Sequence, residues 1–207
     1  ADYTKANNTT ALNLTGSWTT AVVPGPVDVA VWDSNFTAAA LASQPQLGAD
    51  ASWQGIRIAN VGGATNGTTL AAAILNTSSA NTLTLGASGI NGSAATQIFV
   101  LQPRLSIGAS QTWNITNANT QNAPVSGLAV NEDLAILAQA AGAPINLGGN
   151  TVTKTGAGTV AFSSGHTISN GTFNVNAGVL HIQSGSSRVT TVNSDAAFIV
   201  NSGGTLS

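Results

Sequence analysis

Residues 151–182 read TVTKTGAGTVAFSSGHTISNGTFNVNAGVLHI and alternate short apolar runs with turns rich in Gly, Asn and Ser. The runs at 159–162, 172–175 and 178–182 have the two-residue period of β-strands. The intervals between them are too short to hold helices. The pattern predicts a chain that coils into stacked β-strands, an architecture that favours a surface scaffold over an enzyme. The glycines that mark the turns are Gly156, Gly158, Gly165, Gly171 and Gly178.

Short blocks recur elsewhere in the chain. LTLGAS at 83–88 returns as LSIGAS at 105–110, a shift of 22 residues, and INLGG at 145–149 follows 40 residues later, close to two such steps. FNVN at 173–176 returns as FIVN at 198–201, a shift of 25 residues. Periods of 20–50 residues are typical of solenoids, so we expect an all-β solenoid of about nine irregular rungs. A β-sandwich, which also contains many short strands, is the alternative fold.

Three Ala-rich segments, 36–42, 70–75 and 131–138, contain residues with helix propensity. We interpret them as strands or turn connections lined with small side chains. We therefore expect few or no helices, and at most one short helix near 131–140.

The chain divides into two regions by composition. Residues 1–16 are polar and predict an extended N-terminal arm. Residues 17–207 form the predicted solenoid, with an irregular front half to about residue 150 and a regular repeat over 151–207.

The regular region carries a family motif. TKTGAGT at 153–159, followed by NVNAGVL at 174–180, resembles the passenger-associated transport repeat, also called the autotransporter-associated β-strand repeat. The resemblance implies a secreted or cell-surface right-handed parallel β-helix and no catalytic residues. Members of the family run on through many repeats to a membrane-embedded β-barrel, and this sequence contains neither. Looser similarity is found at Trp18, 24–26, 28–32, 83–90 and 110–113.

The chain carries few charges, with 5 Lys and Arg against 7 Asp and Glu and a charged fraction of 6%. Without a basic cluster we expect no nucleic-acid partner. No apolar run reaches the roughly 18 residues of a membrane helix, so we expect no membrane insertion by this chain. Cysteine is absent, which excludes disulfides and Cys-based sites.

The first residue, Ala1, indicates a processed terminus of the kind that cleavage of a secretion signal leaves. A sequence that begins inside a longer protein is the alternative. With the low charge and the family resemblance, this predicts a secreted or cell-surface, extracellular bacterial protein.

Candidate chemical groups are sparse. His166 is expected in a turn and His181 on the outer side of a strand, and neither has an evident carboxylate partner. We interpret the scattered carboxylates as turn caps, and we predict no catalytic residue, no metal site and no cofactor. Trp18, Trp32 and Trp53 are expected to form an N-terminal core cluster. An exposed aromatic face for sugars and a Thr-rich face for ice are minor alternatives.

The C-terminal segment 197–207 ends on a strand-like run without Pro or a charge cluster to protect its edge. Our hypothesis is that this edge accepts the N-terminal arm of the next copy, which gives a filament or surface matrix. The alternatives are a passenger fragment of an autotransporter-type adhesin and, disfavoured, a carbohydrate-active β-helix enzyme. The partners considered are copies of the chain itself and a surface polysaccharide. The residues expected at the contact are Asp2, Tyr3, Leu12, Leu14, Phe198, Val200 and Leu206.

Overall fold

The computed structural model describes residues 1–37, 43–59, 70–76, 80–95, 98–116, 128–139, 142–186 and 189–207. Within these ranges the chain is all-β, and it includes the short 3-10 turn η1 (Thr15–Ser17). The strands are β1 (Asp2–Thr4), β2 (Val29–Asp33), β3 (Ala51–Ala59), β4 (Leu70–Ile74), β5 (Thr82–Asn91), β6 (Ile98–Leu101), β7 (Arg104–Ile107), β8 (Gln111–Asn114), β9 (Leu134–Ile136), β10 (Ala143–Asn146), β11 (Thr151–Thr155), β12 (Thr159–Phe162), β13 (His166–Ser169), β14 (Gly171–Val175), β15 (Gly178–Ile182), β16 (Thr191–Val192), β17 (Ala196–Val200) and β18 (Gly204–Leu206).

The strands form two parallel sheets. Three branches of the 12-stranded sheet meet at the long strand β5: the path from β16 through β7, the path from β17 through β8, and the path β1-β2-β3. The first half of β5 pairs with β7 and its second half with β8, and both halves pair with β3. The 6-stranded sheet has the order β18-β15-β12-β9-β6-β4. Every pairing between these strands is parallel.

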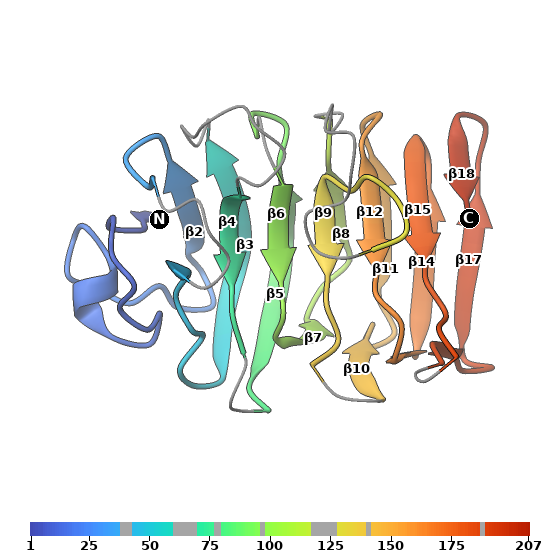
Figure 1. The fold of residues 1–207 in the computed structure, drawn as a ribbon, viewed down its shortest axis with the longest axis horizontal. Coiled ribbons are helices and arrows are strands. Elements are labelled where there is room, and N and C mark those ends of the chain that lie inside the picture. The colour runs from blue at the N-terminus through green and yellow to red at the C-terminus, as the bar shows by residue number, and fades with distance from the viewer. Residues whose placement is uncertain are drawn as a thin grey trace.

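The chain visits the same three strand positions in turn. From β10 onward, each strand pairs with the strand three places later, so that β12 pairs with β15 and β15 with β18. We call one such passage a circuit. The circuits lie side by side along the long axis of the molecule, with the two termini toward opposite ends (Figure 1).

The register of the sheets confirms the repeats found in the sequence. Leu83 pairs with Leu105, and Phe173 pairs with Phe198. The shift of 40 residues is one step, because Ile145 pairs directly with Leu105. The prediction of two steps there was wrong, and the expected number of about nine rungs has no support in a sheet of six strands.

Part of the 40-residue step between β7 and β10 lies over the outer surface of the 6-stranded sheet. Leu128 is buried in a small hydrophobic cluster with Ala73, Val100, Ala135 and Ala161, which lie along the 6-stranded sheet. The backbone N–H of Ala129 donates to Gln183 Oε1 at 2.8 Å, which holds the crossing segment near the end of β15. Small outward side chains therefore leave room for a segment that lies over the sheet.

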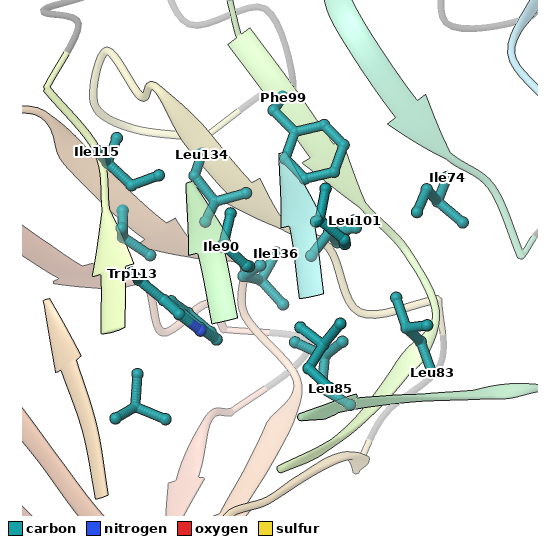
Figure 2. Packing of buried hydrophobic residues seen from close by; sticks show 14 of the residues in the cluster. Ile74, Leu83, Leu85, Ile90, Phe99, Leu101, Trp113, Ile115, Leu134 and Ile136 are labelled. Atoms are coloured by element: carbon teal, nitrogen blue, oxygen red, sulfur yellow. The ribbon is translucent and has the colours of Figure 1, made fainter. Parts of the chain in front are cut away.

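The main core fills the space between the two sheets. Figure 2 shows Leu134 and Ile136 of β9 packed with Ile90 of β5 and Trp113 of β8. Because inward positions alternate along each strand and the strands are in register, equivalent side chains stack in columns. The predicted N-terminal Trp cluster is confirmed, since Trp18, Trp32 and Trp53 have ring centroids 5.9–6.3 Å apart.

The interpretation of residues 131–138 as a strand or turn connection is confirmed, because Leu134–Ile136 is the strand β9 and residues 131–139 contain no helix. Asp133, interpreted as a turn cap, accepts a hydrogen bond from the backbone N–H of Thr159 at 2.7 Å. Residues 70–75 contain the strand β4, as expected. The predicted connection at 36–42 lies for the most part outside the described residues.

Candidate self-association surfaces at the two ends of the sheets

The last circuit, β16 to β18, forms one end of the molecule. Each of these strands ends its path in the sheet order, so that within the described chain no strand pairs with their outer edges. β17 is the longest of the three, and all five of its residues pair with β14 on the inner side. An unpaired row of backbone N–H and C=O groups is a template for a further strand.

The core columns are exposed at this end. Val175 is 0% exposed, whereas Val200, its partner in the next circuit, is 44% exposed. Leu180 is 1% exposed, whereas its partner Leu206 is 41% exposed. The inward side chains of the last circuit therefore occupy core positions and are covered on one side only.

Phe198 shows the same arrangement with an aromatic ring. Its ring stacks on that of buried Phe173, with centroids 5.6 Å apart and planes inclined by 5°. Phe173 continues inward to Trp113, at 5.7 Å between ring centroids in an edge-to-face contact. The aromatic column therefore begins in the middle of the molecule and ends at its C-terminal surface.

Turn glycines hold the successive circuits close together. Gly178, at the start of β15, has φ of +67°, which favours glycine. A Cβ atom there would lie 2.4 Å from the carbonyl oxygen of Gly158 and 2.5 Å from that of Gly156. The glycines of the family-like motif therefore permit both the turn and the close approach of the neighbouring circuit.

The buried side chain of Lys154 bonds to the same turns from the interior of the molecule. Its side chain is buried, and Nζ donates to the carbonyl oxygens of Gly156 at 2.8 Å and Ala177 at 2.9 Å. These acceptors lie on successive circuits, so the ammonium group joins two turns. Burial lowers the pKa of Lys154 to about 8, and the charge of Asp133 opposes this shift.

The opposite, N-terminal end is covered by its own chain. Leu12 is 1% exposed and belongs to the main core, and its carbonyl oxygen accepts a hydrogen bond from Trp18 Nε1 at 2.9 Å. Lys5 is buried over the ring of Phe36, and Nζ donates to carbonyl oxygens of Ala6 and Asn8. Burial lowers the pKa of Lys5 to about 8.

The predicted arm, residues 1–16, is thus packed on its own chain. β1 pairs in parallel with β2, and Asp2 forms an ion pair with Arg57. The bridge between Lys5 and Trp18 and the hydrogen bond from Thr19 N–H to the Thr4 carbonyl cover the end of β1. An arm that reaches another copy would first have to leave these contacts.

The predicted contact residues therefore fall into three groups. Phe198, Val200 and Leu206 come together at the C-terminal end, as the sequence indicated. Asp2, Tyr3 and Leu14 lie at the other end, where Leu14 is exposed and Tyr3 packs partly against the core. Leu12 lies in the interior, so we remove it from the proposed surface.

Sequence analysis missed Val192, which is exposed although its partner in the previous circuit, Ile168, is buried. Only two residues of β16 are in strand, and this short run carries no alternation that a sequence could reveal. The 25-residue repeat of 173–176 was the signal that placed β17 correctly.

The histidines have different environments. His166, expected in a surface turn, is buried on β13, with Nε2 3.1 Å from the Ile136 carbonyl oxygen and Nδ1 3.3 Å from that of Ala143. Burial lowers the pKa of His166, and the two carbonyl contacts oppose this shift. His181 is partly exposed on the outer side of β15, as predicted, with Nδ1 3.0 Å from Ser207 Oγ.

The described ranges lack two further kinds of feature. They contain no group of three or more His, Cys, Asp or Glu side chains placed to hold a metal ion. They also contain no helix with the length and hydrophobicity that a membrane crossing requires.

No protein-family model matches the chain, and no curated protein or solved structure has significant similarity to it.

Proposed function

We propose that this chain is a right-handed parallel β-solenoid with a structural role, and that it self-associates through its C-terminal circuit. The observation that carries the proposal is the exposed end of the core, where Phe198, Val200 and Leu206 occupy core positions without cover on one side. Exposed apolar side chains beside unpaired strand edges are characteristic of interaction surfaces.

The solenoid assignment rests on the parallel register and on the recurring circuits. The passenger-associated transport repeat supports the same assignment and its right-handed sense. The residues that resemble its motif have structural roles here, because Lys154 joins two turns and Gly178 permits their close approach. In this proposal the motif specifies how circuits stack.

An extracellular or cell-surface location and a non-enzymatic role belong to the same proposal. With a charged fraction of 6%, long-range repulsion between copies is weak, which favours association. Head-to-tail growth into a filament, expected from the sequence, requires an N-terminal end that accepts strands. Residues 5–19 cover much of that end, so the C-terminal circuit is the surface on which we base the proposal.

Sedimentation velocity over a range of concentrations tests this function. The wild-type chain should change from monomer to a larger species as the concentration rises. Val200→Asp should shift this transition to at least tenfold higher concentration, because it places a charge among apolar side chains. Thr112→Asp is the matched control, since it adds the same charge on an exposed position of β8 far from both ends.

A monomer at every concentration would contradict the proposed self-association. Uniform monomeric rods in negative-stain electron micrographs would then favour the passenger fragment of an adhesin, with a ligand bound on a lateral face.

A further inference from the structure

We infer that His166 is a pH-sensitive latch, whose neutral ring holds the two sheets together at one corner and whose protonation releases that corner. The inference goes beyond the proposed self-association and does not depend on it. The latch is a single side chain at the start of β13, and it is 2% exposed. We call the residues around it the His166 corner, namely Ile136, Ala138, Ala143, Ser163, Gly165 and Thr190.

The ring of His166 connects the two sheets. Nε2 lies 3.1 Å from the carbonyl oxygen of Ile136, at the end of β9 in the 6-stranded sheet. Nδ1 lies 3.3 Å from the carbonyl oxygen of Ala143, at the start of β10 in the 12-stranded sheet. The ring also packs edge to face on Phe162, with centroids 6.0 Å apart. Movement of the ring out of the interior would therefore break direct contacts between the sheets.

The two carbonyl contacts determine how the ring is held. Both neighbours of the ring are acceptors, whereas a neutral imidazole carries a single N–H group. We assign that proton to Nε2, because its contact with Ile136 is the shorter one. Nδ1 then presents a lone pair to the Ala143 oxygen. The neutral ring is thus held by one hydrogen bond and by its packing.

A second proton would place a positive charge in this interior. The strands that surround the ring or pair with β13, namely β9, β10, β12 and β16, contain no Asp, Glu, Lys or Arg. Glu132 and Asp133 precede β9 at the end opposite Ile136, and Asp195, after β16, is exposed. Arg104, on β7 beside β10, is also exposed, and Arg188 lies outside the described residues. Two carbonyl dipoles compensate such a charge only in part.

The direction of the pH effect follows from this environment. Burial lowers the pKa of His166 from the ordinary value of 6.5, and the hydrogen bonds to Ile136 and Ala143 oppose the shift. In an open corner the ring is in water and has its ordinary pKa. The open form therefore binds the second proton more tightly than the closed form. The closed corner is favoured above pH 6.5 and becomes less stable as the pH falls below that value.

The rest of the His166 corner is held largely by side-chain hydroxyl groups. The Ala138 N–H donates to Ser163 Oγ at 2.8 Å, and the Gly165 N–H donates to Thr190 Oγ1 at 3.2 Å. Thr190 Oγ1 in turn donates to the Gln183 carbonyl at 2.9 Å. Water can replace such hydroxyl partners, so this corner can open locally while the sheets stay paired.

Native-state hydrogen exchange at pH 7 and pH 5, corrected for intrinsic exchange rates, tests the latch. In the wild-type chain the amides of Ala138, Ala143 and Gly165 should lose at least fivefold in protection at pH 5. The amide of Gly108, which donates to the Leu85 carbonyl at 2.8 Å away from the His166 corner, should change by less than twofold. Dilute monomeric samples keep this result separate from the proposed self-association.

Two glutamine variants assign the effect to one ring. His166→Gln keeps a polar donor that does not titrate, so the loss of protection at pH 5 should disappear. His181→Gln is the matched control, because it removes the other histidine, which is partly exposed on the outer side of β15. It should leave the loss as in wild type. An equal loss in His166→Gln would overturn the inference.

Nitrogen-15 NMR of the wild-type ring gives a test that does not depend on the folding of a variant. At pH 7 His166 should carry its proton on Nε2, and the second proton should bind below pH 6.5 together with the loss of amide protection. A ring that gains the proton while the His166 corner keeps its protection would overturn the inference. So would a ring that stays neutral at pH 5 with protection unchanged.

Discussion

At the scale of single residues, two buried lysines affect the stability of this fold. Lys5 and Lys154 each place an ammonium group among backbone carbonyl oxygens, one at the covered N-terminal end and one between successive turns. Such hydrogen bonds offset part of the cost of burying a charge. Both pKa values are nevertheless lowered to about 8 by burial.

These lysines predict a pH dependence of stability. Between about pH 8 and pH 10.5 the unfolded chain keeps both lysines protonated, whereas the folded chain has released those protons. Stability therefore rises with pH through this window, because the unfolded state binds more protons. Melting temperatures measured from pH 7 to 10 should increase. Lys154→Met and Lys5→Met should each reduce the slope, and an unchanged slope in both variants would refute this explanation.

The turn glycines allow a matched comparison. Gly149 and Gly178 both have positive φ, +78° and +67°, but a Cβ at Gly149 would meet nothing within 4 Å. Gly149→Ala should therefore lower the free energy of unfolding by only about 1–2 kcal/mol, the cost of the left-handed conformation. Gly178→Ala should cost about 3–5 kcal/mol, because neighbouring backbone must also move. Denaturant unfolding measures both, and equal losses would exclude the close-packing role.

At the scale of strands, the position of a side chain in the stack of circuits determines how much it contributes to the free energy of unfolding. Val175 and Val200 have the same side chain in the same column, one circuit apart. The inner valine is covered on both sides, and the outer one on a single side.

The two valines should consequently respond differently to truncation. Val175→Ala should lower the free energy of unfolding by about 2 kcal/mol at any protein concentration. Val200→Ala should cost about 0.5 kcal/mol in the dilute monomer and should weaken self-association. Urea unfolding of dilute samples and sedimentation of concentrated ones give the two quantities. A Val200→Ala chain that loses as much monomer stability as Val175→Ala would show that the last circuit is already covered.

Strand pairing was the part of the fold most accessible from sequence. The matching blocks at 83–88 and 105–110 pair in the register that their alignment implies, because one inward pattern must repeat for columns to form. The step to 145–149 was misread, since a sequence alone does not show that a segment such as Leu128 lies over the outside of a sheet. Residues 131–138 have helix propensity, and the strand β9 forms there because local propensity yields to pairing with the distant strands β6 and β12.

The candidate surface was predictable only in part. The absence of protective residues after 197 pointed to an open C-terminal edge, and Phe198, Val200 and Leu206 lie there. The covered N-terminal end was not predictable, because it depends on how the segment from Lys5 to Thr19 folds back onto β1. Polarity in residues 1–16 indicated exposure, whereas Leu12 is anchored in the core.

On the scale of the whole molecule, the two ends differ and the flanks carry little charge. Within the described residues, every large apolar side chain that is exposed lies either at 14–27 or at 189–206. Association should therefore depend on apolar contact and backbone pairing at the ends, with a small electrostatic part.

This predicts a characteristic salt response. Raising NaCl from 0.1 to 1 M should leave the association constant within about twofold, because few charges are available to screen. Sodium sulfate should strengthen association, since it favours burial of apolar surface. Sedimentation at fixed protein concentration measures both effects. A tenfold loss of affinity in NaCl would show that ion pairs, and not the apolar circuit, hold the copies together.

The circuits also determine how the molecule bears tension. Each circuit is bonded mainly to the circuits before and after it, and the outermost one, β16 to β18, has a neighbour on one side only. A force applied to the two chain ends would detach that circuit first and then its neighbours in sequence. The first two steps, at β17 and β14, would each release about 20–25 residues, roughly 70–90 Å of extended chain, and the next, at β11, about 40 residues. Such a molecule would extend in successive increments and absorb mechanical work without a single complete rupture.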